Sequence, residues 1–108
     1  MKTTMDTSNT GHIQFPIQGD LLSTNAAAIR SQLDAFLAVS QGGAGWAVLE
    51  LDLRRAAMVD SVGLNFLVSL HKRLAVDGKR LRVLILSESV RRILRFTRLD
   101  QYVEVAEG

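Results

Sequence analysis

Cysteine is absent from the 108 residues of the chain. Its absence excludes disulfide bonds, thiolate metal sites and cysteine nucleophiles together. The chain also lacks an apolar run approaching the roughly 20 residues that a membrane-spanning helix needs. The N-terminal stretch MKTTMDTSNTG has no apolar centre of the kind that a secretory signal carries. We therefore expect a cytoplasmic protein without redox chemistry.

Length and hydrophobic content predict a single domain. A chain of 108 residues with 47% hydrophobic residues is large enough to bury one core. Residues 1–10 are polar and poor in core-forming side chains, so they predict a flexible tail or a weak edge strand. The domain itself is expected over residues 11–108.

Positive charge is concentrated in the C-terminal third. The net charge is only +2, yet residues 71–98 hold nine Lys and Arg against two acidic residues. Such a bias suits nucleic acid, anionic lipid or an acidic protein surface, or it forms only a solvated helix face. The basic residues are interleaved with core positions and lack aromatic partners for base stacking. We favour the solvated face and expect no nucleic-acid partner.

Strand-like and helix-like patterns alternate along the chain. Period-two or densely apolar segments predict strands over 12–19, 46–53, 80–87 and 102–105, while period-3.6 segments predict helices over 26–39, over 61–76 and after Ser87. The glycine-rich 41–45 is expected to end the first helix, and Pro16 indicates an edge strand or a bulge. This alternation predicts an α/β fold, a mixed, mostly parallel sheet of four to five strands with about three to four α-helices.

The helix over 61–76 has more apolar positions than one stripe requires. A first stripe holds Leu64, Leu67, Val68, Leu70 and Leu74, and Val62 and Phe66 add to it. Either some of them face a partner, or the helix is enclosed between the sheet and a neighbouring helix. The sequence favours neither interpretation.

An acid, a hydroxyl and a glycine separate the second strand from this helix. In parallel sheets, ligands gather at the carboxyl ends of strands, where unpaired N–H groups of the following helix attract anions. Asp60 or Ser61 is suited to cap those groups, and Gly63 permits the close approach of another backbone. Taken alone, these residues fit a structural cap as well as a functional site.

Three ordered motifs resemble one family. Asp60-Ser61-Val62-Gly63-Leu64 resembles the D-S-x-G-L signature of the STAS domain, especially of bacterial anti-sigma factor antagonists. Gly19-Asp20-Leu21 resembles the G-[DE]-L that precedes the first helix of such domains. The segment SESVRRIL, residues 87–94, followed by Thr97-Arg98-Leu99 resembles their closing helix. The resemblance covers about residues 11–106 and implies a STAS-like sandwich.

The resemblance implies a switch in which Ser61 is phosphorylated. Its partner is then a serine kinase of the histidine-kinase-like ATPase fold that also acts as an anti-sigma factor, and a serine phosphatase resets phospho-Ser61. The unmodified domain binds the kinase and the phosphorylated domain is released, which regulates transcription or a related partner-switching pathway. The implied partner-binding residues are Asp60, Ser61, Val62, Gly63, Leu64 and Asp20. Asp60 either caps the helix or orients the hydroxyl and helps to position the nucleotide and metal of the kinase.

We expect no enzymatic activity, no cofactor, no metal and no direct membrane insertion. Only His12 and His71 are present as imidazole bases, and neither lies near Ser61 in the sequence. The chain departs from the family at Leu22, where relatives often carry an acid, and at Val62, where they often carry a second hydroxyl. Two alternatives remain: a STAS subunit of a membrane system that transports lipid or anions, and an unmodified protein-binding module.

Overall fold

The strands of the sheet are parallel and follow the order of the chain. The structure is a computed structural model that describes residues 11–43 and 46–107. Its four-stranded sheet has the order β1-β2-β3-β4. The strands are β1 (His12–Pro16), β2 (Val48–Asp52), β3 (Arg80–Ile85) and β4 (Glu104–Glu107). Every neighbouring pair is parallel, which confirms the predicted α/β fold.

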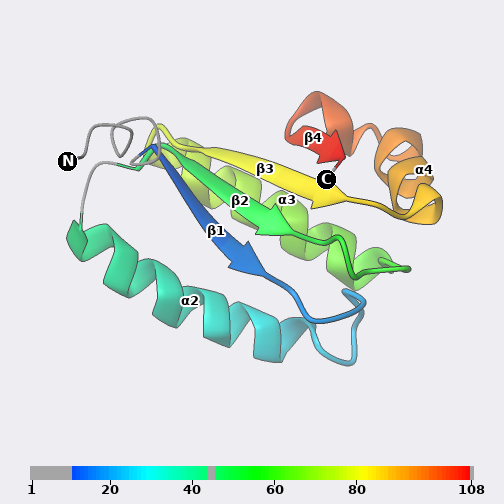
Figure 1. The fold of residues 1–108 in the computed structure, drawn as a ribbon, viewed down its shortest axis with the longest axis horizontal. Helices are drawn as coiled ribbons and strands as arrows, with labels where there is room; N and C mark the ends of the chain where they lie inside the picture. Colours follow the sequence, from blue (N-terminus) through cyan, green and yellow to red (C-terminus); the bar gives the residue numbers. More distant parts are fainter. Residues whose placement is uncertain (1–10, 44–45, 108) are drawn as a thin grey trace.

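The helices connect successive strands and cover one face of the sheet. They are α2 (Ala26–Gly43), α3 (Ser61–Val76) and α4 (Glu88–Phe96), and the 3-10 turn η1 (Leu99–Gln101) follows α4. Because crossovers between parallel strands are right-handed, a sheet built in one direction receives all its helices on the same face. Figure 1 shows α2 and α3 along the sheet and α4 beyond the arrowhead of β3. Within the described part of the chain, no helix has the length and apolar character to cross a membrane.

Alternate positions of the two central strands form the floor of the core. Leu49 and Leu51 of β2 and Val83 of β3 are fully buried, as the period of two requires. The helices complete the core with Leu33 and Leu37 of α2, Phe66, Leu67, Leu70 and Leu74 of α3, and Val90 and Leu94 of α4.

Helix α3 is enclosed by its neighbours. Leu64 and Val68 are half-buried and pack against the same core, so α2 and the sheet together absorb its surplus apolar positions. Val62 in the first turn and Val76 at the end of the helix are exceptions, with 42% and 85% of their surfaces exposed. The enclosed interpretation is therefore confirmed for the middle of this helix and not for its two ends.

The other face of the sheet carries a row of polar side chains. Gln14, Glu50, Arg82 and Glu104 occupy one register line across all four strands. Gln14 Nε2 donates to Glu50 Oε1 at 3.1 Å, and Arg82 lies 3.5 Å from Glu50 and 3.8 Å from Glu104. We call these four side chains the polar row.

Several element boundaries differ from the prediction. Helix α2 continues through Gly42 to Gly43 instead of ending before residue 41. A glycine costs about 1 kcal/mol in a helix interior, and a long helix tolerates it in the last turn. Strand β4 begins at Glu104, because Tyr102 closes the 3-10 turn. Pro16 lies on an edge strand, as predicted. The tail expected over 1–10 lies outside the described residues.

A matched pair of leucine substitutions tests the placement of the core. Leu51 is fully buried in β2, whereas Leu86, which follows β3, is 60% exposed. Leu51→Ala is expected to lower the free energy of unfolding by about 2–5 kcal/mol. Leu86→Ala is expected to change it by less than about 0.5 kcal/mol. Urea denaturation measures both values, and equal losses would contradict the assigned strand faces.

Candidate functional site

The segment between β2 and α3 is held in place by a second strand-like pairing. Val59 forms an isolated parallel bridge with Leu21, and Leu21 N–H donates to the carbonyl of Met58 at 3.1 Å. Leu21, Ala56 and Val59 are all buried. Apolar anchors and backbone pairing thus fix this connection before the helix begins.

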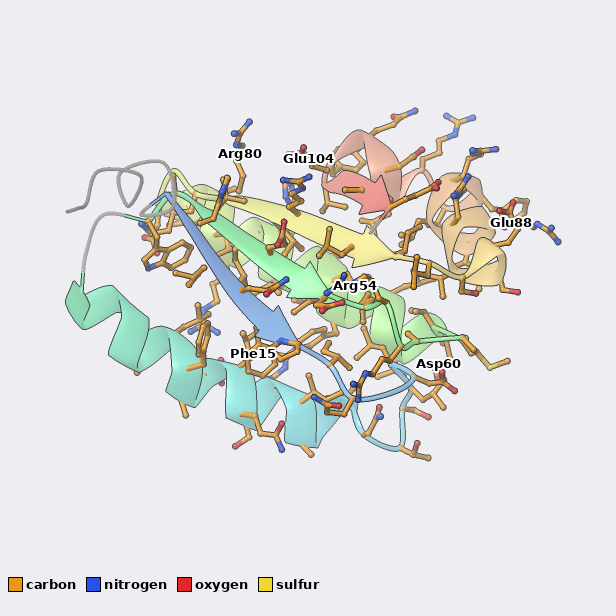
Figure 2. All side chains as sticks on the ribbon, in the orientation of Figure 1. Phe15, Arg54, Asp60, Arg80, Glu88 and Glu104 are labelled. Atoms are coloured by element: carbon orange, nitrogen blue, oxygen red, sulfur yellow. The ribbon has the colours of Figure 1, made fainter. Side chains whose placement is uncertain are left out.

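Asp60 caps α3 and binds a second segment at the same time. Its Oδ1 accepts the N–H of Gly63 at 2.9 Å, which satisfies one of the unpaired donors of the first turn. Its Oδ2 accepts the N–H of Ser23 at 2.8 Å. Figure 2 shows Asp60 beyond the arrowhead of β2, at the same end of the molecule as Glu88. Both carboxylate oxygens are engaged with backbone, which supports the capping interpretation of this residue.

Asp20 makes the reciprocal contact. Its Oδ1 accepts the N–H groups of Ala57 at 2.7 Å and Met58 at 3.2 Å. Asn25 supports this segment, because its side chain donates to the carbonyl of Asp20 at 2.7 Å. Each aspartate therefore accepts backbone donors of the other segment. We call Asp20 and Asp60 the aspartate clamp.

Gly63 is required by a close backbone contact. A Cβ at this position would lie 2.4 Å from the carbonyl oxygen of Leu21 and 2.9 Å from Cγ1 of Val59. Real Cβ atoms do not approach a backbone oxygen so closely. The sequence-based expectation that Gly63 admits a neighbouring backbone is confirmed.

Ser61 lies exposed at the first position of α3. Its neighbours Met58 and Val62 are large apolar residues that are 55% and 42% exposed. We call Met58, Ser61 and Val62 the acceptor surface. Met58 was not among the predicted site residues, and its only sequence signal is a large apolar side chain in a loop that follows a strand.

The predicted site residues separate into a surface and its support. Ser61 and Val62 are exposed, whereas Gly63 is buried and Leu64 is half-buried against the core. Asp20 and Asp60 are partly buried and fix the backbone. The structure therefore brings all six residues to one end of the molecule, with only two of them open to a partner.

Neither histidine of the chain is a neighbour of Ser61. His71 follows Ser61 by ten residues along α3, which places it about 15 Å further down the helix axis, where its ring lies 6.0 Å from that of Tyr102. His12 lies in β1. Over residues 11–43 and 46–107, no group of three or more potential ligand side chains could hold a metal ion.

The turn already stabilises negative charge. Hydrogen bonds from the backbone N–H groups of Gly63 and then Ser23 hold the pKa of Asp60 below its usual value. The N-terminal end of a helix favours anions for the same reason. Asp60 therefore remains ionised beside Ser61 at neutral pH.

Substitution of the glycine tests the close contact. Gly63→Ala is expected to lower the free energy of unfolding by about 1–3 kcal/mol, because the clash involves backbone and outweighs the helix propensity of alanine. Gly11→Ala is the control, since no atom lies within 4 Å of a Cβ there. Thermal and urea unfolding of both variants measure the difference. A Gly63→Ala protein as stable as the control would refute the contact.

The clamp is also expected to give a pH-dependent contribution to stability. Because folding lowers the pKa of Asp60, its contribution is complete above about pH 5 and is lost as the pH falls below the ordinary value of 3.8. Asp60→Asn should be less stable than wild type at pH 7, and the gap should narrow towards pH 3. Urea denaturation across this range measures it. A gap that stays constant with pH would exclude a role for the ionised carboxylate.

The sequence and the fold both match known proteins. A family model described as the STAS domain matches residues 4–107. The crystal structure of a candidate anti-sigma factor antagonist from Thermotoga maritima superposes with a TM-score of 0.77 at 22% identity, covering 91% of this chain and 80% of that one. An NMR structure of the same Thermotoga protein gives 0.71 at 23% identity, covering 91% and 75%.

A further solved structure has the same fold. The anti-sigma factor antagonist from Mycobacterium paratuberculosis superposes with a TM-score of 0.72 at 23% identity, covering 89% of this chain and 77% of that one. At such identities the likeness establishes the fold. The family model, in contrast, spans almost the whole sequence, and the chain therefore belongs to the STAS domain family.

Proposed function

We propose that this protein is a cytoplasmic anti-sigma factor antagonist that is switched by phosphorylation of Ser61. In the unmodified state it binds a serine kinase of the histidine-kinase-like ATPase fold that acts as an anti-sigma factor. Phosphorylation releases the domain, and a serine phosphatase restores it. The exposed Ser61, held at the start of α3 by the aspartate clamp, is the observation that carries this proposal.

The acceptor surface has the properties of a kinase substrate. The hydroxyl of Ser61 is open to an enzyme, and its backbone position is fixed by Asp60 on one side and by the Gly63 contact on the other. Met58 and Val62, close to Ser61 in the chain, offer exposed apolar area. A partner that covers these side chains gains from burying apolar surface and surrounds the acceptor oxygen.

Modification changes the docking surface more than the fold. A phosphate adds about 1.5 to 2 negative charges at a helix N-terminus, which tolerates anions. The same charge would follow the ionised Asp60 directly in the chain and would join a surface that includes the exposed Met58 and Val62. A partner that docks on the unmodified surface must then desolvate an unpaired dianion, which costs several kcal/mol. Binding is lost while the domain stays folded.

The domain acts as substrate and binding partner, not as an enzyme. Ser61 has no imidazole within reach to activate it as a nucleophile. The family also leaves room for a subunit of a lipid or anion transport system, which would use the same fold without the switch. The exposed acceptor serine favours the switch over that alternative.

Phosphorylation by the kinase encoded nearest in the genome tests the proposal. The purified domain is incubated with that kinase and ATP, and its intact mass is measured. We expect one addition of about 80 Da on wild type and none on Ser61→Ala. Ser89→Ala is the matched control, because Ser89 is also an exposed serine in the first turn of a helix, α4. It should be labelled like wild type.

Binding of the same kinase completes the test. Calorimetry should show tight association for wild type and Ser61→Ala, and at least about a tenfold loss for phospho-Ser61 protein. Labelling that persists in Ser61→Ala would move the site elsewhere. Absence of both labelling and binding would favour the transport subunit or the unmodified module.

A further inference from the structure

A hollow opens at the carboxyl ends of the strands, apart from the acceptor surface. It has a volume of about 380 Å³ and is lined by Pro16, Ile17, Gln18, Asp52, Arg54, Arg55 and Leu86. Pro16 and Asp52 are register partners at the ends of β1 and β2, and they continue the face that carries the polar row. The volume lies within the range of small-molecule sites.

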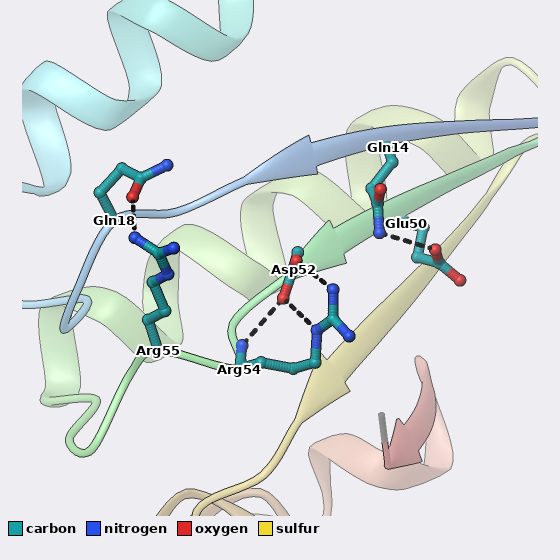
Figure 3. Close-up of polar contacts among 6 residues, drawn as sticks. All are labelled: Gln14, Gln18, Glu50, Asp52, Arg54 and Arg55. Carbon is teal, nitrogen blue, oxygen red and sulfur yellow. Dashed lines mark hydrogen bonds and ion pairs between the residues drawn. The ribbon is translucent and has the colours of Figure 1, made fainter.

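Arg54 is held rigidly against one wall of the hollow. Its Nε and Nη2 donate to the two carboxylate oxygens of Asp52 at 3.0 and 2.9 Å, and its backbone N–H donates to Asp52 Oδ1 at 3.0 Å (Figure 3). These hydrogen bonds from Arg54 hold the pKa of Asp52 below its usual value, despite partial burial. The carboxylate is thus matched by one guanidinium and adds no net charge to the hollow.

Arg55 contributes a positive charge that this cluster does not neutralise. Its Nη1 donates to Oε1 of Gln18 at 2.6 Å, and the amide carries no charge (Figure 3). Gln18 therefore orients the guanidinium without cancelling it. With Arg54 matched by Asp52, the described lining keeps one net positive charge. Guanidinium groups bind phosphate and carboxylate in a forked geometry.

The same hollow offers apolar surface. Leu86, in the segment that follows β3, is 60% exposed, and Pro16 is exposed at the end of β1. An apolar ligand group that covers Leu86 would remove this surface from water. A fixed cation beside an exposed apolar wall is the combination that selects an organic anion over a simple inorganic one.

We propose that this hollow binds a small organic anion, with its phosphate or carboxylate on Arg55 and its apolar body on Leu86 and Pro16. The binding site is independent of Ser61, because none of its lining residues belongs to the acceptor surface. It nevertheless shares a loop with the switch, since Ala57 and Met58, whose N–H groups donate to Asp20, lie two and three residues after Arg55. A bound anion would therefore contact the loop that leads to Ser61.

Titrations with defined anions test the site. The ¹⁵N-labelled wild-type protein is titrated at constant ionic strength with inorganic phosphate, phenyl phosphate and benzoate, while amide shifts are followed by NMR. We expect saturable amide shifts around 17–18, 54–55 and 86, with phenyl phosphate or benzoate binding more tightly than inorganic phosphate. The tighter of the two organic anions identifies the head group.

Three variants make the test specific. Arg55→Gln should lower the affinity for the organic anion by about tenfold or more, since a charge-assisted hydrogen bond is lost. Leu86→Ala should lower the affinity for the organic anion and leave the affinity for inorganic phosphate unchanged. Arg92→Gln is the control, because it removes the same charge from an exposed position on α4 outside the hollow, and it should bind like wild type. Equal losses in Arg55→Gln and Arg92→Gln, shifts centred on residues 61–63, or no saturation would overturn the proposal.

Discussion

Two aspartates, Asp20 and Asp60, connect segments that are distant in sequence and position the backbone around Ser61. Asp20 accepts backbone donors from residues 57 and 58, and Asp60 accepts one from residue 23, so each segment supplies the partner that the other lacks. Neither segment is a strand of the main sheet, and both would otherwise leave polar backbone groups without partners near the core. The bridge between Leu21 and Val59 brings both residues close to the start of α3. Only a glycine fits at position 63, because a Cβ there would clash with both of them. The start of α3 is a consequence of this arrangement.

Charge has a different role in each part of the molecule. Three of the nine basic residues over 71–98 form ion pairs: Arg73 pairs with Asp34, Arg82 with Glu50 and Glu104, and Arg91 with Glu88 and Glu107. These pairs connect strands and helices, and they contribute little stability individually where they are exposed. In the hollow, by contrast, the charge of Arg55 is not paired with a carboxylate of the described lining. Such a charge affects the choice of ligand more than ion-paired arginines on the open surface do.

Local patterns predicted the elements, whereas contacts distant in sequence had to be observed. The period of 3.6 and the Asp60-Ser61 junction placed α3 at its observed bounds, and Ser87 was correctly expected to precede α4. The role of Asp20 was out of reach, because its partners lie 37 and 38 residues away and a backbone N–H has no sequence signature. The glycines at 42 and 43 were expected to lie outside the first helix, and this prediction was wrong. Helix propagation is cooperative, so a helix already formed over 26–39 continues through residues of low helix propensity.

The sequence named the residues of the candidate site, and the structure adds which of them are exposed and which are buried. The motif identified Ser61 and its neighbours, yet only the fold separates the exposed Ser61 and Val62 from the buried Gly63. Met58 escaped notice because loops contain apolar residues for many reasons, and exposure is a property of the folded chain.

The polar row has a consequence for how the domain coexists with others. A sheet covered by helices on one side only presents a flat second side, which in many proteins attracts another sheet. Here such stacking would strip water from Glu50, Arg82 and Glu104 at once, on the two most central strands and one edge. This face of the sheet therefore disfavours face-to-face stacking with the sheet of a second copy.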